Sequence, residues 1–312
     1  MRITVIIPTW RRVEKLRACL ASLEEQQCPP DQVIVTLRAD DDGTRDFLAE
    51  WCTKSVLNYH LLTVREPGVV HAENQAIAFV RDSKSCDVVT FMDDDAIAHP
   101  DWIKKINIFF HEYTDAAALG GPDVIATEPW TYHERPVKTV GVITIFGKVI
   151  GNHHHKSEGL REVDVLKGVN MSFRAQHLRA LDSRLQGLDP ARGNGVFWEL
   201  DLCLNVKSNG GKIYFDPTLL ITHDSNHGHF IKDAVVASTA HNLTFLMMKH
   251  LPPWRRSLFL IYSCLVGNGH VHGLVKTSVE CFRQRSLRPL HVFRVSMNGV
   301  LRGLRLSLLG AP

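Results

Sequence analysis

Strand and helix signals alternate over the first hundred residues, and this alternation limits the fold more than any other feature of the chain. Runs of β-branched and aliphatic residues at 3–7, 33–37, 60–64 and 88–92 are typical of strands buried on both faces. The segments between them, at 12–26, from 43 to about 52 and at roughly 70–82, read as single helices. This order predicts an α/β fold with a doubly wound, mostly parallel central sheet, in which ligands bind at the carboxyl ends of the strands.

The pattern changes after residue 100. A helix at 101–112 precedes a strand at 117–120, a β-rich stretch at 137–150, helices at 175–185 and 198–208, and strands at 212–215 and 219–222. Strands that follow one another without a helix favour a mixed half of the sheet. From about residue 231 the pattern is helical, with a break at Pro252 and Pro253. We therefore expect one domain at 1–228, made of the halves 1–100 and 101–228, and a helical extension at 229–312.

The C-terminal end is strongly basic. Residues 255–312 contain nine Lys and Arg but only one acid, Glu280, whereas the whole chain has a formal charge of only +3. The rest of the chain is therefore net acidic and does not look like a nucleic-acid binder. The basic end indicates an anionic partner, such as a membrane surface.

Two interpretations of the basic end stay open. The groups suited to lie on an anionic membrane are Leu258, Phe259, Tyr262, Val266, Arg255 and Arg256. An ordinary helical subdomain, or a contact in a homodimer, fits the same pattern. The longest late apolar run, 258–266, is about half of the roughly 20 residues that span a bilayer, and the run 3–7 is too short for a signal peptide. With seven scattered cysteines, this predicts a cytoplasmic protein. Under the first interpretation it is also peripheral at the inner face of the cell membrane.

The first glycine of the chain is Gly43, so the first strand is not followed by a glycine-rich phosphate loop. A bound nucleotide would need another cradle for its phosphates, and carboxylates holding a metal ion are the obvious substitute. Asp93, Asp94 and Asp95 directly follow the strand 88–92, and alternation along an extended chain lets Asp93 and Asp95 point to the same side. Two such carboxylates suit Mg²⁺ or Mn²⁺. A solvated acidic turn before the next helix is the alternative.

Five segments of the chain resemble one family, the nucleotide-sugar glycosyltransferases of the GT-A fold, and more narrowly family 2, whose members are inverting. The segments are VIIPTWRR at 5–12, GVVHAEN at 68–74, FMDDDAIAHPDW at 91–102, KGVNMSFR at 167–174 and WELDLCLNVKSNGGKIYFDPTLLITH at 198–223. The resemblance covers roughly residues 1–225. It implies a hexosyltransferase-like enzyme with a nucleotide-binding half at 1–100 and an acceptor-binding half at 101–228.

The reaction implied by the resemblance is the transfer of a sugar from a nucleoside-diphosphate sugar to a saccharide or lipid-linked saccharide, with Mn²⁺ or Mg²⁺, in polysaccharide or glycolipid assembly. The residues implied to bind the donor are Pro8, Thr9, Arg11, Arg38, Asp40, Asn74, Asp93 and Asp94. Asp40 looks like the acid that contacts the base or ribose, but Arg38 stands where many members have an acid. The acids at 40–42 fit a plain turn before Gly43 equally well.

The resemblance also implies a metal site. Asp93 and Asp95 match the two acids of the family's DxD motif and are both implied to hold the metal, with Asp95 favoured over Asp93 as a direct ligand. His223 resembles a downstream histidine that ligates the metal in many related enzymes, and an imidazole beside carboxylates suits Mn²⁺. A structural histidine is the alternative for His223. The run His153 to His155 is expected to be a flexible polar loop, with contact to the diphosphate or the acceptor as the alternative.

Glu199 takes the position of the family's general base, which removes a proton from the acceptor hydroxyl. We expect Asp201 to cap a helix or make a structural hydrogen bond. Gly168, Asn170 and Trp198 are implied on the acceptor side, although Trp198 could equally belong to the core.

Two other functions compete with this interpretation. A sugar-phosphate nucleotidyltransferase shares the sheet and the metal carboxylates, but has a glycine-rich loop where this chain has PTWRR. A non-catalytic member would only bind nucleotide sugar or serve as a scaffold for polysaccharide assembly at a membrane.

Overall fold

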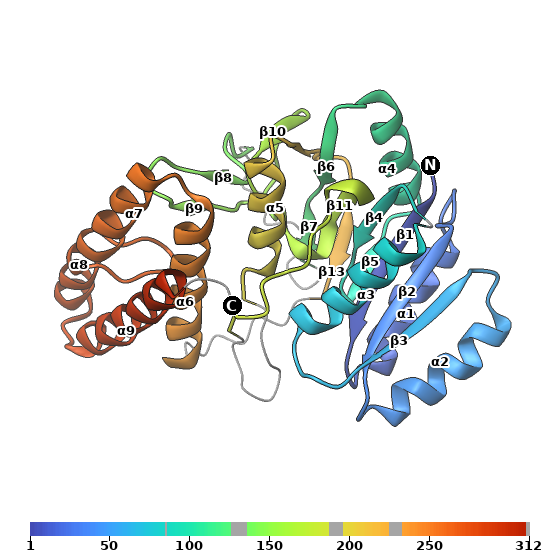
Figure 1. Ribbon diagram of the computed structural model, residues 1–312, viewed down its shortest axis with the longest axis horizontal. Helices are drawn as coiled ribbons and strands as arrows, with labels where there is room; N and C mark the ends of the chain where they lie inside the picture. The colour runs from blue at the N-terminus through green and yellow to red at the C-terminus, as the bar shows by residue number, and fades with distance from the viewer. Residues whose placement is uncertain (85, 126–135, 187–195, 225–232, 310–312) are drawn as a thin grey trace.

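The computed structural model describes residues 1–84, 86–125, 136–186, 196–224 and 233–309. Figure 1 shows a sheet flanked by helices on one side of the molecule and a group of helices on the other. Within the described ranges, the main sheet has eight strands in the order β10-β12-β6-β11-β4-β1-β2-β3. The predicted α/β class with a helical C-terminal part is therefore confirmed.

One half of this sheet is parallel. Its strands are β1 (Ile3–Thr9), β2 (Gln32–Arg38), β3 (Tyr59–Val64) and β4 (Val88–Phe91), and they alternate with the helices α1 (Val13–Glu24), α2 (Asp42–Lys54) and α3 (Val69–Ser83). β1 pairs in parallel with β2 and β4, and β2 pairs in parallel with β3. The carboxyl ends of these strands therefore meet at one edge of the sheet.

Helices cover both faces of this half because the strand side chains alternate between two cores. Ile6 of β1 packs in one core with residues of α3, such as Ile77. Ile7, its neighbour, packs in the other core with Leu20 of α1 and Ile106 of α4 (Trp102–Glu112). The doubly wound arrangement follows from this period of two.

The other half of the sheet is mixed, as predicted. It contains β6 (Ala116–Gly120), β10 (Arg161–Val163), β11 (Met171–Arg174) and β12 (Lys212–Phe215). β11 runs antiparallel to both β4 and β6, β10 runs antiparallel to β12, and β12 runs parallel to β6. β11 thus joins the two halves.

A small second sheet has the order β5 (Ala96–Ala98), β13 (Ile221–His223) and β7 (Asp123–Ile125). β13 pairs antiparallel with β5, with His223 opposite Ala96, and parallel with β7, with Ile221 opposite Asp123. This register places the end of β13 beside the three aspartates that follow β4.

The β-rich stretch predicted at 137–150 forms only a short hairpin. Its two-residue strands β8 (Val142–Ile143) and β9 (Val149–Ile150) pair antiparallel, and Gly141 and Gly147 turn the chain with φ angles of +61° and +71°. His153, expected in a flexible polar loop, is instead buried, with Nε2 placed 2.9 Å from the carbonyl oxygen of Val165.

The helix predicted at 175–185 is reduced to one short 3₁₀ turn, η2 (Ala175–His177), after β11. A second 3₁₀ turn, η1 (Gly168–Asn170), lies just before β11. Leu178, Leu181 and Leu185 have helical spacing and are buried. The backbone of Leu181, however, forms hydrogen bonds with a residue outside this segment. The amide of Asn74 bonds to both the N–H and the carbonyl of Leu181 at 2.7 and 3.0 Å, which replaces the helical hydrogen bonds.

The C-terminal helices are α5 (Trp198–Ser208), α6 (Asp233–His250), α7 (Pro253–Leu265), α8 (Leu274–Gln284) and α9 (Arg288–Leu308). α9 packs closely along α6, since an added Cβ at Gly299 or Gly303 would lie 2.4 Å from a carbonyl oxygen of α6. No helix in the ranges listed above is long and apolar enough to cross a membrane. The proposed domain boundary at 228 lies outside the described residues.

The apolar group predicted to lie on a membrane is partly wrong. Phe259 is fully buried, and its ring lies where a side chain at Gly147 would have to go. Tyr262 stacks on Phe146 with ring centroids 5.0 Å apart. These side chains hold α7 against the β8–β9 hairpin, so the outward face of α7 carries other residues.

Asp201 ties α5 to α6. Its buried carboxylate accepts hydrogen bonds from Lys249 (2.8 Å) and the backbone N–H of Asp182 (2.8 Å), and lies 2.7 Å from Nε2 of His250. These contacts outweigh the effect of burial, which opposes ionisation, and lower the pKa of Asp201. The structural hydrogen bond predicted for Asp201 is therefore present.

We expect Asp201→Asn to lower the free energy of unfolding by about 3 kcal/mol, because it leaves Lys249 and the Asp182 amide without their carboxylate. Urea denaturation followed by circular dichroism measures this change. Asp42→Asn, at a carboxylate that is almost fully exposed, is the matched control and should have little effect. Equal stability of the two variants would contradict the structural role of Asp201.

Candidate active site

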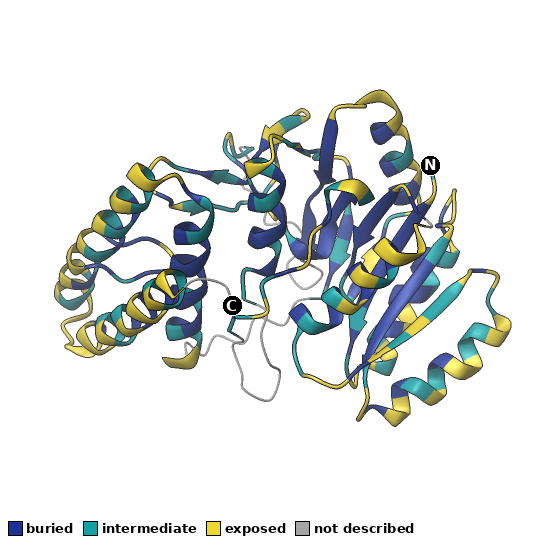
Figure 2. Cartoon of the chain, viewed as in Figure 1, coloured by how far each residue is buried: buried dark blue, intermediate teal, exposed yellow. Residues whose placement is uncertain are grey.

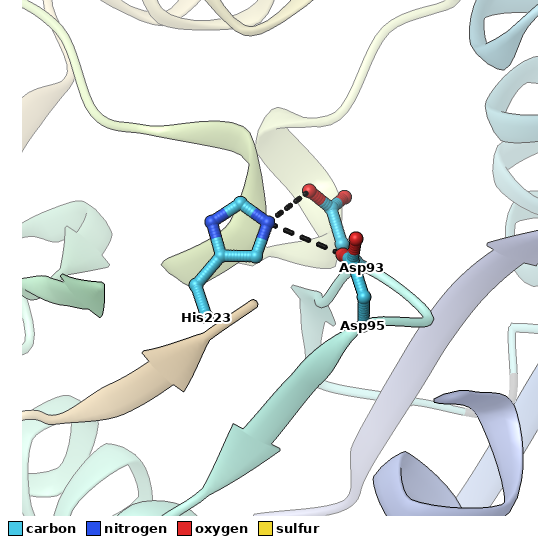
Figure 3. Close-up of side chains that lie close together, drawn as sticks. All are labelled: Asp93, Asp95 and His223. Atoms are coloured by element: carbon cyan, nitrogen blue, oxygen red, sulfur yellow. Dashed lines mark ion pairs between the residues drawn. The ribbon is translucent and has the colours of Figure 1, made fainter. Parts of the chain in front are cut away.

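Asp93, Asp95 and His223 come together at the edge where β4 and β13 end (Figure 3). Nε2 of His223 lies 3.2 Å from Oδ1 of Asp95 and 3.6 Å from Oδ2 of Asp93. One ligand atom from each of the three lies within 4.8 Å of the other two. The two carboxylates therefore point to the same ring nitrogen.

Asp94 points the other way. It is buried, accepts a hydrogen bond from Thr9 Oγ1 at 2.8 Å, and pairs with Arg12 at 2.9 Å. These contacts fasten the turn after β4 to the turn after β1. Because Asp94 is held in this direction, its neighbours Asp93 and Asp95 face His223.

Asp123 supports His223 from behind. Its Oδ2 lies 3.6 Å from Nδ1 of His223 and 2.9 Å from Nζ of Lys167, and its side chain is almost completely buried. Burial alone would lower the pKa of His223, but the interactions with Asp123, Asp95 and Asp93 raise it to about 9. Burial also opposes ionisation of Asp123, yet His223 and Lys167 hold the pKa of Asp123 well below its usual range.

This cluster fits a divalent cation. It offers two carboxylate oxygens and one imidazole nitrogen, a donor set suited to Mn²⁺ and acceptable to Mg²⁺. A carboxylate behind a histidine, as Asp123 is here, fixes the ring orientation in metal sites. The second oxygen of Asp95 pairs with Arg12 at 3.1 Å and with Lys15 at 3.4 Å, which leaves Oδ1 facing the cluster.

A cleft of about 670 Å³ lies between the first turns of α1 and α2, and two residues of its lining, Arg12 and Lys15, pair with Asp95 of the cluster. Its lining comprises Arg11, Arg12, Val13, Glu14, Lys15, Asp40, Asp41, Asp42 and Gly43. Asp41 caps α2 by accepting from the N–H of Thr44, and it also accepts from the N–H of Arg11, which has a φ angle of +55°. The chain turns at 39–40 and α2 already begins at Asp42, so the acids predicted as a plain turn at 40–42 only partly form one. Asp41, at the start of α2, holds this wall of the cleft.

Arg38 and Asp40 pair at 2.9 Å beside this cleft. The guanidinium of Arg38 lies 4.5 Å from the ring centroid of Trp10, and that of Arg11 lies 5.2 Å from the same centroid. Pro8, at the end of β1, is half-buried and pairs with Thr36 of β2. The structure thus brings most of the residues predicted for donor binding to the carboxyl ends of β1 and β2.

Glu199 lies in the first turn of α5, directly after Trp198 and after Phe197, which has a φ angle of +62°. Its side chain is half-buried. Burial raises the pKa of Glu199 to about 7, and the charge of Asp93 adds to this rise, while a backbone hydrogen bond and Lys167 oppose it. A carboxylate with such a pKa is suited to general-base chemistry near neutral pH.

Trp198 and Gly168 form one contact. An added Cβ at Gly168 would lie 2.7 Å from the Trp198 ring, and that ring meets Phe91 edge-to-face at 5.6 Å. Trp198 is 7% exposed, so most of the ring belongs to the core. Its role on the acceptor side stays a prediction.

Asn170 lies in the interior. Its amide donates to the carbonyls of Pro122 (3.0 Å) and Leu219 (2.8 Å) and accepts from Nε1 of Trp102 (2.9 Å). The side chain is fully buried and fully bonded. Asn170 can therefore affect the acceptor side only through the backbone that it holds. Asn74 similarly holds Leu181.

Glu73 is a residue that the sequence reasoning missed. It is 1% exposed, and neither carboxylate oxygen has a hydrogen-bond partner among the described residues. Burial raises the pKa of Glu73 well above its usual range, and the negative charge of Asp93 adds to the rise. The available signal was its position: Glu73 shares the apolar spacing of Val70, Ile77 and Val80 on α3.

Comparison with known sequences supports the predicted family. The model of the family described as glycosyl transferase family 2 matches residues 4–198. The chain is 32% identical over 192 residues to a glucosyl-dolichyl phosphate glucuronosyltransferase of Haloferax volcanii, covering 56% of this chain and 53% of that protein. It is 31% identical over 122 residues to YfnE, an uncharacterized glycosyltransferase of Bacillus subtilis, covering 39% and 30%. The matched region is thus about half or less of the length of these curated relatives.

Solved structures share the fold at low sequence identity. A mannosyltransferase from Pyrobaculum calidifontis in complex with GDP-Man and Mn²⁺ superposes with a TM-score of 0.58 at 15% identity, over 98% of this chain and 87% of that one. TarS 1–349 of S. aureus in complex with UDP-GlcNAc gives a TM-score of 0.61 at 13% identity, over 97% and 81%. These similarities confirm the GT-A type of fold.

We expect Glu73→Gln to stabilise the protein increasingly as the pH rises above the ordinary titration range of a glutamate. The raised pKa means that the unfolded chain ionises first, so the stability associated with Glu73 is complete at low pH and is lost as the pH rises. Melting temperatures of the native and variant proteins, compared from about pH 5 to about pH 8, measure the difference. Glu66→Gln, at an exposed glutamate, is the control. A constant difference across this range would contradict the assignment.

Proposed function

The chain belongs to glycosyl transferase family 2, and we propose that it is a metal-dependent, inverting enzyme that moves a sugar from a nucleoside-diphosphate sugar to an acceptor hydroxyl. The observation that carries this proposal is the convergence of Asp93, Asp95 and His223 beside the Arg11–Asp40 cleft, with Glu199, in the first turn of α5, near enough to Asp93 for that charge to raise its pKa. We also propose the division into a nucleotide-binding half, 1–100, and an acceptor-binding half, 101–228.

Asp93, Asp95 and His223 would hold Mn²⁺ or Mg²⁺. Such an ion supplies positive charge that stabilises the diphosphate leaving group. The donor set and the buried Asp123 behind His223 support the assignment, and a mannosyltransferase of the same fold contains Mn²⁺ and GDP-Man. Either Mn²⁺ or Mg²⁺ would occupy this one site.

The nucleoside would occupy the cleft between α1 and α2. Arg11 and Lys15 provide positive charge there, and the Arg38–Asp40 pair provides hydrogen-bonding groups for a base or ribose. We propose that Pro8 and Thr9 shape its floor. Asp94 and Asn74 would act by holding the surrounding segments, since their side chains already bond within the protein.

Glu199 would act as the general base. Its carboxylate removes the proton of the acceptor hydroxyl, whose oxygen then attacks the anomeric carbon on the face opposite the leaving group. A bond forms from that oxygen to carbon as the bond to the diphosphate breaks, which inverts the configuration. The pKa of about 7 supports this role, because the ionised form is available near neutral pH and still binds a proton.

The acceptor is proposed to be a saccharide or a lipid-linked saccharide, in polysaccharide or glycolipid assembly. The name of the Haloferax volcanii relative joins a glucosyl-dolichyl phosphate to glucuronosyl transfer, which supports a lipid-linked acceptor here. Gly168 and Trp198, beside Glu199, would border the acceptor. We also propose that the enzyme works at the cytoplasmic side of the membrane in which such an acceptor would be anchored.

We expect one of UDP, dTDP and GDP to bind with a clear dependence on Mn²⁺, and Asp95→Asn to weaken that binding at least about tenfold, because a metal ligand is lost. Isothermal titration calorimetry with and without Mn²⁺ measures both effects. Asp87→Asn, just before β4 at the opposite edge of the sheet, is the matched control. Binding of none of the three nucleotides under either condition would overturn the proposal.

We expect Glu199→Gln to reduce turnover by about 10²–10⁴-fold while nucleotide affinity stays unchanged, because only the base is removed. Release of nucleoside diphosphate from the sugar nucleotide, in the presence of acceptor, measures turnover. The native rate should rise with pH as Glu199 ionises, with a midpoint around its pKa of about 7. A cation bound nearby favours the carboxylate and would move this midpoint to a lower pH.

Glu25→Gln, at an exposed glutamate, is the control for that series. Full turnover in Glu199→Gln would exclude Glu199 as the base. Nucleotide binding without any release of diphosphate, across suitable acceptors, would favour the non-catalytic binding or scaffold alternative.

A further inference from the structure

Helix α7 exposes apolar side chains on a face other than the one that buries Phe259 against the β8–β9 hairpin. Trp254, Ile261 and Leu265 are each at least half exposed. They are spaced seven and four residues apart, so they lie along one stripe of the helix. The buried Phe259 lies on the opposite side and holds the helix in place.

Helix α8 repeats the arrangement. Val275, Val279 and Phe282 follow one another at intervals of four and three residues, and Phe282 is 90% exposed. Thr277, on the other side of the helix, is buried. The solvent-facing side of α8 is therefore its apolar side, the reverse of an ordinary surface helix.

Helix α9 exposes a stripe of mixed character. The residues along it are Leu290, Arg294, Leu301, Arg305 and Leu308, which recur at intervals of four, seven, four and three. Gly299 and Gly303 lie on the opposite side, where α9 packs on α6. Because the glycine side of α9 packs on α6, this stripe faces away from α6.

The three helices adjoin one another, since α8 contacts both α7 and α9. Figure 2 shows exposed residues along the outer sides of these helices and buried residues on α6 behind them. Single exposed apolar residues are normal, but three such stripes on adjoining helices indicate an interaction surface. We call the outer sides of α7, α8 and α9 the outer helical face.

The outer helical face is cationic. Its exposed arginines are Arg283, Arg285, Arg288, Arg294, Arg302 and Arg305. None of these six forms an ion pair with an acid in the described part of the chain. Glu280, the one acid of 255–312, is half-buried and lies 3.6 Å from His272. The face thus combines apolar side chains with uncompensated positive charge.

We propose that the outer helical face docks on the surface of an anionic lipid bilayer. Apolar side chains flanked by arginines are the composition of helices that lie in the interface of a membrane, with the apolar groups among the acyl chains and the guanidinium groups at the phosphates. Surface docking also agrees with the finding that none of the described helices can cross a membrane.

A second copy of the chain is a poorer occupant. A two-fold dimer would place the same patch against itself, so the six arginines of one copy would face those of the other. Among the described residues of α8 and α9, Glu280 is the one acid that could compensate them. An anionic bilayer satisfies both the apolar stripes and the charge. The inference deepens the proposed function and rests on it for its purpose, since docking would bring the site to a lipid-linked acceptor.

Co-sedimentation of the full chain with lipid vesicles, without nucleotide sugar, tests the proposal. We expect binding to phosphatidylcholine vesicles that contain phosphatidylglycerol, and at least about tenfold weaker binding to vesicles of phosphatidylcholine alone. The double variant Val279→Ser with Phe282→Ser should weaken binding by about tenfold or more, since two apolar side chains no longer insert. The double variant Arg294→Gln with Arg305→Gln should weaken it by about twentyfold.

The controls use side chains of equal exposure on the sheet side of the molecule. Val56 is 90% exposed, like Phe282, so Val56→Ser should leave vesicle binding unchanged, as should Arg81→Gln on α3. All substituted side chains are exposed, so circular dichroism should show native folding for each variant. Calorimetric nucleotide binding, measured on the same samples, should be unaffected.

Three results would overturn the proposal. The first is that the protein binds neither kind of vesicle. The second is that the control variants lose as much vesicle binding as the test variants. The third is that light scattering shows a dimer, which the test variants dissociate, while the vesicles bind no protein. Failure of the proposed function appears separately, because nucleotide binding can be lost while vesicle binding persists.

Discussion

The position of Asp94 is the constraint on which the site depends. Three successive aspartates cannot all face one point, and the contacts of Asp94 with Thr9 and Arg12 decide which two remain on the side of His223. Those contacts need the parallel pairing of β1 with β4, which brings the ends of the two strands to one edge. The order of the strands in the sheet therefore determines that Asp93 and Asp95 are held together on the side of His223.

Charges behind this pair connect the two chemical parts of the site. Lys167 lies 2.9 Å from Asp123, which supports His223, and its charge also acts on Glu199. Asp93 influences Glu199 and Glu73 in the opposite sense, raising the pKa of both carboxyl groups. A positive charge gained near Asp93 would therefore change the proton affinity of Glu199, so donor binding and proton removal would not be independent events.

Local pattern was enough to predict the parallel strands, the three aspartates, α5 and the helical C-terminal part, because each depends on periodicity within a short segment. The helix predicted at 175–185 failed for a reason outside that segment: Asn74 and Asp201, distant in sequence, take its backbone groups. Glu73 and Asp123 were missed because burial of an acid is decided by tertiary packing. The same packing turns Phe259 inward and leaves Phe282 outside.

Asp201 has a mechanical consequence. It lies two residues after Glu199 on the same helix and is bonded to Lys249 and His250 at the end of α6, against which α9 is packed through Gly299 and Gly303. Asp93, in contrast, is anchored to the sheet through β4. Since a helix moves as a nearly rigid rod, a tilt of the C-terminal helices relative to the sheet would be transmitted through α5 as a change in the separation between base and donor site.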